Sequence, residues 1–254
     1  MMTKTTLSIS IFGLLAVLTG CSNDEAVSVT AEQQTVTPPS ANSSTIRGDD
    51  FTGVWGPVFT EDFAHRLVGP MRGDYTGLPL NDAAKEFADN FDEASQYDYE
   101  NQCKSHTTLY AFRSPFQFEI MQSNNLLSIT TESFEQVRTV YLDGREHHPP
   151  TADHSRMGHS IGHWQGNMLV VSTINMEAGY LRRNFAPHSE NAHLTEYIVR
   201  HTGPAPYEEF LTITSVLDDP EYLTEPLVRN LSYRKIPDGT LEPYPCERID
   251  FDAF

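Results

Sequence analysis

The stretch "HSIGHWQGNMLVVSTI", residues 159–174, decides how the fold of this chain is read. Together with the preceding glycine it opens as Gly-His-Ser-Ile-Gly, a match to the G-x-S-x-G nucleophile elbow of serine esterases. An elbow requires a helix directly after the serine, because the start of that helix supplies backbone N–H groups to the oxyanion. A Gly-Asn turn and a run rich in β-branched residues follow instead. The stretch therefore predicts a β-hairpin.

Two catalytic interpretations of this hairpin fail on spacing. An esterase of that fold places an acid and then a histidine after the serine, but no aspartate occurs between Ser160 and Asp218, and the last histidine is His201. Glu177 or Glu190 could substitute for the acid, but nothing in the sequence places either of them beside Ser160. His159 and His163 resemble a zinc-binding H-x-x-x-H pair, but residues four apart in a strand lie about 13 Å apart, too far for one metal ion. We therefore expect neither a nucleophile at Ser160 nor a zinc pair.

Alternating apolar residues and short polar turns extend the β pattern along most of the chain. Residues 123–125 and the dipeptide Asp143-Gly144 predict two further hairpin turns. Residues 80–94 have helical periodicity instead, with Asn81 or Asp82 as the cap. The patterns predict a mainly β domain, a single antiparallel β-barrel or sandwich of lipocalin or calycin type, with one N-terminal helix. The expected strands are residues 51–59, 116–122, 126–132, 136–142, 159–164, 168–174, 194–201, 208–217 and 227–236.

The N-terminal residues have the pattern of an export signal. A short positive start and an apolar run at residues 7–18 lead into "LTGC", residues 18–21, which resembles a bacterial lipobox. The resemblance implies that residues 1–20 are a lipoprotein signal peptide and that Cys21 is lipidated. The alternative is an ordinary secretory signal with an incidental cysteine. We therefore expect a lipid-anchored protein that faces the periplasm.

The segment behind the lipobox divides the chain into an anchor and a folded part. Ser22, which follows the cysteine, favours the outer membrane of a Gram-negative bacterium. Residues 21–49 are polar and poor in aromatic side chains, so they are expected to form a disordered tether. The β domain is then expected to span residues 50–254, an ordinary size for one domain.

Charge limits the classes of partner. The chain carries a formal net charge of −18, which disfavours nucleic acid, anionic lipid headgroups and polyanionic polysaccharides. We expect a small-molecule ligand or substrate, no nucleic acid, and membrane contact only through the lipid anchor. No cofactor and no metal ion are predicted.

Two cysteines remain beyond the lipobox, Cys103 and Cys246. In an oxidising compartment two cysteines favour one disulfide, with a pair of free thiols as the alternative.

Several blocks of the domain together resemble a large family of exported proteobacterial and acidobacterial proteins, many of them lipoproteins. The blocks are "PFQFEI" (115–120), "VRTVYLDGREHH" (137–148), "MGHSIGHWQGNMLVVST" (157–173), "PHSENAHLTE" (187–196) and "DDPEYLTEPL" (218–227). The resemblance covers residues 103–247 and implies no particular activity. It places His163 where other members often carry arginine, which argues against an essential role for His163.

The polar residues of those blocks are the candidates for a site. Glu196 alternates with apolar residues, so its carboxylate should face the core, where Arg138 is the expected partner. His159, His188 and His193 are the expected proton-transfer groups, because histidine exchanges protons near neutral pH. These five residues are the predicted catalytic set. The residues expected to bind substrate are Glu119, Tyr141 and Trp164.

Three functions fit these residues. The first is an acid–base enzyme of the lyase, isomerase or hydrolase type, with its histidines, carboxylate and arginine in one pocket. The second is a lipocalin-like carrier that encloses an apolar ligand inside its barrel. The third is a periplasmic copper- or zinc-binding protein, although the ten histidines show no diagnostic ligand spacing. A buried Arg–Glu pair with histidines on the barrel rim is the purely structural alternative.

Overall fold

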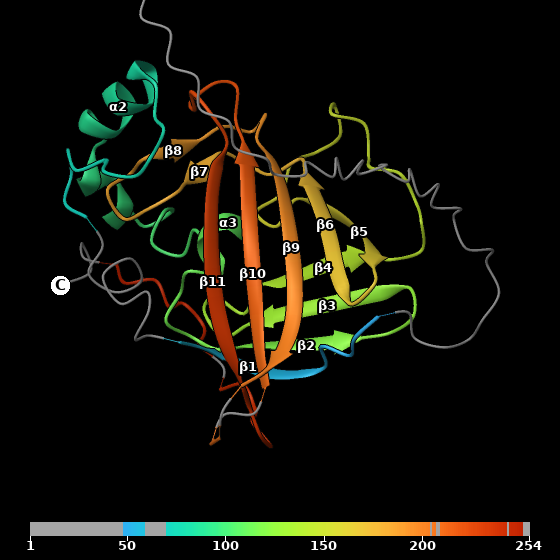
Figure 1. Ribbon diagram of the computed structural model, residues 1–254. Coiled ribbons are helices and arrows are strands. Elements are labelled where there is room, and N and C mark those ends of the chain that lie inside the picture. Colours follow the sequence, from blue (N-terminus) through green and yellow to red (C-terminus); the bar gives the residue numbers. More distant parts are fainter. Residues whose placement is uncertain (1–47, 59–69, 204, 207–208, 243, 251–254) are drawn as a thin grey trace, which may run out of the picture. The chain divides into compact units, whose positions relative to one another are not determined.

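In the described part of the chain, nine strands close into a β-barrel in the computed structural model (Figure 1). The structure describes residues 48–58, 70–203, 205–206, 209–242 and 244–250, so the predicted signal peptide, the lipidation site and nearly all of the tether lie outside the described residues. The order around the barrel is β1, β11, β10, β9, β6, β5, β4, β3, β2, and β2 pairs again with β1. The barrel strands are β1 (Gly53–Pro57), β2 (Phe118–Gln122), β3 (Leu126–Thr131), β4 (Val137–Tyr141), β5 (His159–Gln165), β6 (Met168–Ile174), β9 (His193–Thr202), β10 (Glu209–Asp218) and β11 (Leu227–Ile236). The mainly β fold and the barrel predicted from the sequence are confirmed.

The opening stretch of the sequence forms the predicted hairpin, β5 and β6. Gln165 pairs with Met168, so only Gly166 and Asn167 form the loop. Gly166 has φ +63°, a conformation that a glycine adopts without steric cost at the first position of a tight hairpin turn. Ser160 therefore lies within a strand that leads into a turn, and no helix follows it.

The prediction of a hairpin turn at Asp143-Gly144 is wrong. β4 pairs in parallel with β5, with Val140 opposite Ser160, and residues 142–158 form the crossover that a parallel pair requires. Of the two turn residues only Gly144 has a positive φ, whereas a type I′ hairpin turn needs positive φ at both. Asp143 instead accepts hydrogen bonds from the guanidinium of Arg145 at 2.6–3.1 Å. This crossover carries His147 and His148 past the outer face of the barrel.

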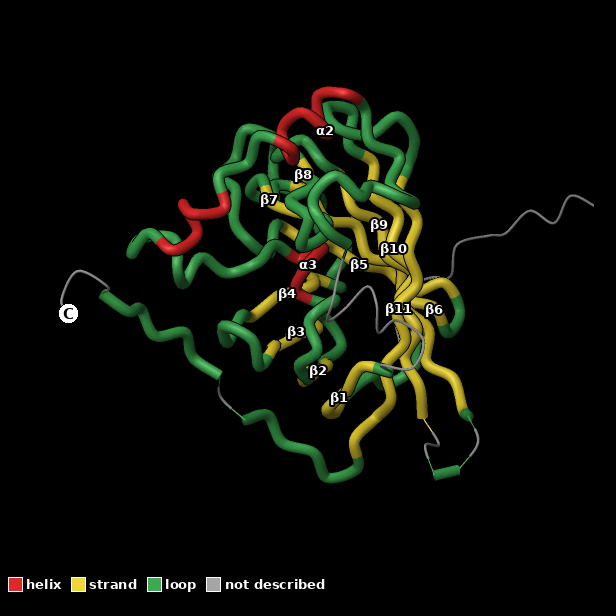
Figure 2. The backbone as a smooth tube through the Cα atoms, turned by 90° about the vertical axis from the view of Figure 1, so that its left-hand side faces the viewer, coloured by secondary structure: helices red, strands yellow, loops and turns green. Residues whose placement is uncertain are grey.

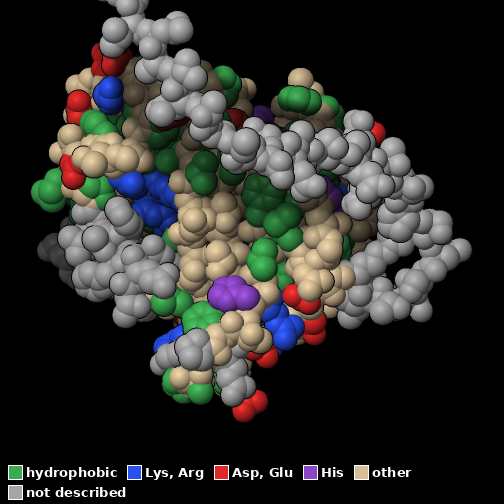
Figure 3. All heavy atoms as spheres, in the orientation of Figure 1, with side chains coloured by type: hydrophobic (Ala, Val, Ile, Leu, Met, Phe, Trp, Pro, Cys, Tyr) green, Lys and Arg blue, Asp and Glu red, His purple; other side chains and the backbone are tan. Residues whose placement is uncertain are grey.

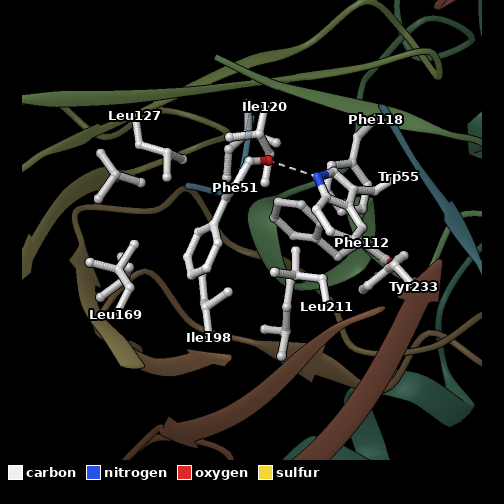
Figure 4. Close-up of a cluster of buried hydrophobic side chains, with 14 residues drawn as sticks. Phe51, Trp55, Phe112, Phe118, Ile120, Leu127, Leu169, Ile198, Leu211 and Tyr233 are labelled. Atoms are coloured by element: carbon white, nitrogen blue, oxygen red, sulfur yellow. Dashed lines mark hydrogen bonds between the residues drawn. The ribbon is translucent and has the colours of Figure 1, made fainter. Parts of the chain in front are cut away.

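Inward-pointing side chains fill the barrel interior. Alternate residues of each strand face inward, as the burial of Leu169 and Val171 on β6 illustrates. Trp55 is fully buried, and its indole N–H donates to the carbonyl of Phe51 at 2.9 Å (Figure 4). The other buried members of this core are Phe112, Phe118, Ile120, Leu127, Ile129, Val140, Ile198, Leu211, Ile213 and Tyr233. The interior is thus packed with aromatic and aliphatic side chains where a lipocalin encloses its ligand.

Short elements cover the barrel near the starts of β9 and β11 (Figures 1 and 2). They are α2 (Asp82–Asp89), the 3-10 helix η2 (Glu93–Tyr97), α3 (Thr108–Ala111), β7 (Gly179–Tyr180) and β8 (Pro187–His188). A second apolar cluster joins this covering to the barrel and includes Ala84, Leu181, Leu194 and Leu227. Phe112, directly after α3, reaches the first core, where its ring meets that of Phe118. We call these elements and their connections the cap.

Helix α2 confirms the predicted helix but is shorter than residues 80–94. Asn81 is the N-cap, and its side chain accepts a hydrogen bond from the N–H of Ala84 at 2.9 Å. Ala84 and Ala88 are fully buried, whereas Phe87 is 41% exposed. Neither α2 nor any other described helix has the length and apolarity to cross a membrane.

A disulfide joins Cys103 to Cys246, as predicted, with a Cα–Cα distance of 5.6 Å. Cys103 lies between η2 and α3, and Cys246 lies in the segment that follows β11. Gln102 holds the same segment, because its side chain both donates to the carbonyl of Ile249 and accepts from its N–H, at 2.8 and 2.7 Å. The disulfide therefore fixes the C-terminal segment to the cap.

Candidate functional site

The buried charges expected from the sequence form one network inside the barrel. Arg138 on β4 donates from Nη2 to the carboxylate of Glu196 on β9, and also to Thr173 Oγ1 at 2.8 Å. Its Nε donates to Ser160 Oγ at 3.1 Å. The side chains of Arg138 and Glu196 are each 2% exposed, and Ser160 and Thr173 are completely buried. Ser160 thus belongs to a hydrogen-bonded structural network inside the barrel.

The histidines on β5 and β9 belong to a different network. His159 Nδ1 lies 3.1 Å from His147 Nδ1, and His147 Nε2 lies 2.8 Å from Ser172 Oγ. Ser172 Oγ lies 2.7 Å from His193 Nε2, which completes a chain of four hydrogen-bonding groups. The ring of His148 stacks on that of His159 with centroids 3.7 Å apart. We call His147, Ser172, His159 and His193 the outer histidine chain.

The two networks lie on opposite faces of the same strands. Successive side chains of a strand point to opposite faces. Ser160 belongs to the inner network and its neighbour His159 to the outer chain; Thr173 and Ser172 divide in the same way. His193 is three residues before Glu196 and takes the opposite parity. The predicted common pocket of His159, His193 and Glu196 is therefore not formed.

Acidification should reveal the outer histidine chain in the stability of the fold. Burial, helped by His148, His147 and Arg145, lowers the pKa of His159 to about 4. The unfolded chain then binds a proton at a higher pH than the folded one, because the ordinary histidine pKa is about 6.5. The contribution of His159 is complete above pH ~6.5 and is lost as the pH falls toward 4, by up to ~1.4 kcal/mol per pH unit.

The measurement is the free energy of urea unfolding between pH 7 and pH 4 in wild type and His159→Asn. In this window the slope of the unfolding free energy against pH should be smaller in the variant by up to ~1.4 kcal/mol per pH unit, because unfolding of the variant takes up about one proton fewer. His201→Asn, at an exposed position on β9, is the matched control for loss of a histidine. Equal slopes in wild type and His159→Asn would contradict the prediction.

A cleft of about 960 Å³ lies within the cap, away from both networks. Residues around η2 and the segment before α3 form one wall, and the segment from Ala178 to His188 forms the other. Aromatic side chains supply much of its apolar surface, and Phe91 stacks on Phe185 with centroids 4.5 Å apart. The aromatic residues that line it are Phe87, Phe91, Tyr97, Tyr110, Phe134, Tyr180, Phe185 and Tyr222.

The charged side chains of the cleft are mostly cationic, in contrast to the chain as a whole. Among the described residues that line the cleft, Glu93 is the one carboxylate, and it pairs with Arg72 at 2.8 Å. Arg156 pairs with Glu177, outside the lining, at 3.0 Å. Arg182 is 8% exposed, and its Nε has no hydrogen-bond partner in the described structure. Figure 3 shows Lys and Arg side chains gathered on the molecular surface below α2. The cationic residues that line the cleft are Arg72, Lys104, Arg156, Arg182 and Arg183.

Two histidines also line this cleft, and burial keeps both neutral. Burial, with a smaller effect from Arg183, lowers the pKa of His106 to about 4. Burial likewise lowers the pKa of His188, which is fully buried. His188 Nε2 lies 2.8 Å from Thr107 Oγ1, and His188 Nδ1 lies 3.1 Å from the carbonyl oxygen of Ser189. Of the five residues predicted to be catalytic, only His188 reaches the cleft.

The three residues predicted to bind substrate lie elsewhere. Glu119 takes the outward position on β2, between the buried Phe118 and Ile120. Trp164 packs against the barrel core, with its ring 5.2 Å from that of Phe51. The ring of Tyr141 lies beside that of His159. The guanidinium carbon of Arg145 lies 3.7 Å from the centroid of the Tyr141 ring. None of the three lines the cleft.

The residues that sequence reasoning missed are Thr107, Lys104, Arg182 and Arg183. They lie in irregular segments, where neither strand nor helix periodicity indicates which way a side chain points. One signal was available, because the pair Arg182-Arg183 is unusual in a chain with twice as many acidic as basic residues. It indicates a local need for positive charge.

The described residues contain no set of side chains suited to bind a metal ion. Among the described residues, no three His, Cys, Asp or Glu side chains are grouped so that they could hold a metal ion. In the outer histidine chain, His159 Nδ1 already faces the backbone N–H of His148 at 3.4 Å, which is an unsuitable neighbour for a cation. The copper- or zinc-binding alternative therefore gains no support from this geometry.

The sequence matches no protein-family model, and no curated protein matches it. The resemblance carried by the sequence blocks therefore stays a prediction.

Proposed function

We propose that this protein binds a small anionic molecule with a planar aromatic part in the cleft of the cap. One observation carries the proposal. The chain has a net charge of −18 and 17 basic residues, yet five of those residues line one cleft, where Glu93 is the one carboxylate among the described lining residues. Clustered like charges repel one another and raise the energy of the folded state, so a cluster of this kind is consistent with selection for an anionic ligand.

The size and walls of the cleft fit the same class of ligand. A volume of about 960 Å³ lies within the range of small-molecule sites, roughly 300–1,000 Å³. The stacked pair of Phe91 and Phe185 offers a flat apolar surface, and the guanidinium of Arg72 lies 5.5 Å from the Phe185 ring centroid. An aromatic ring could stack there while its anionic group approaches the arginines.

Binding in the cleft replaces two functions expected from the sequence. A carrier that encloses its ligand in the barrel is disfavoured, because core side chains such as Phe51, Trp55 and Phe112 occupy the interior. An acid–base pocket of His159, His193 and Glu196 is disfavoured, because the barrel wall separates Glu196 from the two histidines.

Binding of phenyl phosphate and of benzyltrimethylammonium, measured by calorimetry, tests the proposal. The anion should bind and the cation of similar size should not, and added salt should weaken the anion's affinity. The double variant Lys104→Gln/Arg183→Gln should lower that affinity by about tenfold, since ~1.4 kcal/mol of lost attraction is tenfold in Kd.

The matched control is Lys85→Gln/Arg200→Gln, which makes the same charge change outside the cleft. Its affinity for phenyl phosphate should stay within about twofold of wild type. Equal binding of the two probes, or equal weakening in both double variants, would disprove the cleft as an anion site.

We further propose that the domain is held at the outer membrane, facing the periplasm, by lipid on Cys21. The lipobox-like "LTGC" and the polar segment after it support this assignment. Cys21→Ala expressed in a Gram-negative host should move the protein from the membrane fraction to the soluble fraction. If wild type and the Cys21→Ala variant are found in the same fraction, the proposed lipid anchor is wrong.

A further inference from the structure

We propose that Thr107 and His188 act as a nucleophile and its base, and that the protein hydrolyses an ester of a small anionic, aromatic compound. This inference rests on the proposed binding of such compounds in the cleft. Both residues line that cleft, although Thr107 lies before α3 and His188 ends β8. The fold brings them together across 81 positions of the chain.

The hydrogen bonds of His188 determine which atom carries each proton. The carbonyl oxygen of Ser189 can only accept, so His188 Nδ1 must carry the hydrogen that it shares with this oxygen at 3.1 Å. The lowered pKa makes His188 neutral at pH 7, so its Nε2 has a free lone pair. Thr107 Oγ1, 2.8 Å away, must then donate its hydrogen to Nε2. This is the arrangement that activates a hydroxyl nucleophile.

A third group holds the base in place. The carboxylate of Asp219 accepts hydrogen bonds from the N–H and the hydroxyl of Ser189, each at 2.7 Å. Ser189 is 3% exposed, so its carbonyl is held in a rigid setting beside the His188 ring. The charged groups that face His188 are Asp219 and Arg156. The order Asp219, Ser189, His188, Thr107 gives the base an orienting partner, as an activated hydroxyl requires.

The hydroxyl of Thr107 is kept from its usual structural role. Thr107 is the N-cap of α3, where a threonine side chain commonly accepts a hydrogen bond from the helix backbone. Its side chain makes no capping bond here and bonds His188 instead. The oxygen lone pairs are therefore not used by the helix.

Gly179 packs closely against the pair. It stands opposite His188 in the two-stranded β7–β8 pairing. A Cβ at this position would lie 2.8 Å from His188 Nε2 and 2.9 Å from Thr107 Oγ1, closer than real side chains approach. Thr107 and His188 are both buried at the lining of the cleft, and only a glycine at position 179 can lie this close to them.

The reaction balances without a cofactor. Thr107 Oγ1 forms a bond to the ester carbonyl carbon as its proton passes to His188 Nε2. The bond from that carbon to the leaving oxygen breaks, and the leaving alcohol takes the proton from Nε2. A water molecule then attacks the acyl carbon and gives a proton to Nε2, and the bond to Oγ1 breaks as this proton returns to it. Ester and water become acid and alcohol.

Mono(4-nitrophenyl) succinate is the test substrate, because it joins a carboxylate to an aromatic leaving group. The full-length protein should release nitrophenol faster than buffer does, and Thr107→Val should lose about 100-fold or more of that rate. Thr107→Ser should keep most of the rate, because a serine hydroxyl can take the same place. Mass spectrometry of the quenched wild-type reaction should find a succinyl group on the peptide that contains Thr107.

Thr108→Val is the matched control, since Thr108 is a neighbouring buried threonine whose hydroxyl donates to the Met157 carbonyl, 2.8 Å away. It should hydrolyse the ester at the wild-type rate. Phenyl phosphate binding is measured in the same samples. If wild type binds phenyl phosphate but shows no hydrolysis and no succinyl adduct, this inference fails and the binding proposal stands. If Thr107→Val hydrolyses as fast as wild type, the nucleophile assignment is overturned, and absence of phenyl phosphate binding overturns both proposals.

Discussion

Glu196→Ala should lower the free energy of unfolding by about 3–5 kcal/mol. The carboxylate is the one anionic partner of Arg138 within the described network, and both side chains are almost completely buried. Removing it leaves a guanidinium in the barrel interior. Of the interactions described here, it would keep the hydrogen bonds to Ser160 and Thr173 and the contact with the ring of Phe112. A buried charge without a counter-charge is costly, because water cannot reach it.

Removing both charges should cost far less than removing one. In Arg138→Met/Glu196→Leu no charge stays buried, and Ser160 and Thr173 still hydrogen-bond each other at 2.8 Å. We expect the double variant to lie within about 1.5 kcal/mol of wild type in urea unfolding. Glu119→Ala is the control for loss of a strand glutamate at an outward position and should stay within about 0.5 kcal/mol. If the double variant is as unstable as Glu196→Ala, burial of the charge is not the cause.

The barrel could be read from the sequence because its strands obey a period of two. Leu194, Glu196 and Ile198 alternate with more polar neighbours on β9, and this alternation correctly predicts that the Glu196 side chain points into the barrel. The Gly166-Asn167 turn predicts the β5–β6 hairpin in the same way. The hairpin prediction at Asp143-Gly144 failed because a turn dipeptide describes the chain only locally, whereas the paired residues Val140 and Ser160 are 20 positions apart. Strand partners at that distance depend on closure of the whole barrel.

The site was harder to predict because function-like residue types occur on both faces of one strand. His159 and Ser160 are neighbours in the sequence, yet the barrel wall separates their side chains. The sequence shows that they are close along the chain and leaves open which pocket each of them faces. The cleft depends on irregular segments, in which Thr107 and His188 approach only after the cap has packed on the barrel. Such contacts have no period in the sequence from which they could be inferred.

Removal of the disulfide with Cys103→Ser/Cys246→Ser should lower the free energy of unfolding by about 2–4 kcal/mol. The bond closes a loop between positions 143 apart, so its loss frees the unfolded chain considerably. In the folded state the effect should be local. Lys104, next to Cys103, lines the cleft, so we also expect weaker phenyl phosphate binding, whereas the barrel strands are hydrogen-bonded independently of the disulfide.

Hydrogen exchange followed by mass spectrometry separates this local effect from a general one. In the double cysteine variant, amides near Gln102 and Ile249 should exchange much faster than in wild type. These two residues are hydrogen-bonded to each other next to the disulfide, so its loss should loosen their contact. Amides of β9 and β10, which are paired along ten residues, should keep their protection at the same pH. Cys21 must be present in both proteins, so that the proposed lipid anchor is the same in both. Equal loss of protection in the cap and in β9 would mean that the disulfide supports the whole barrel, and the claim that it acts on the cap would be abandoned.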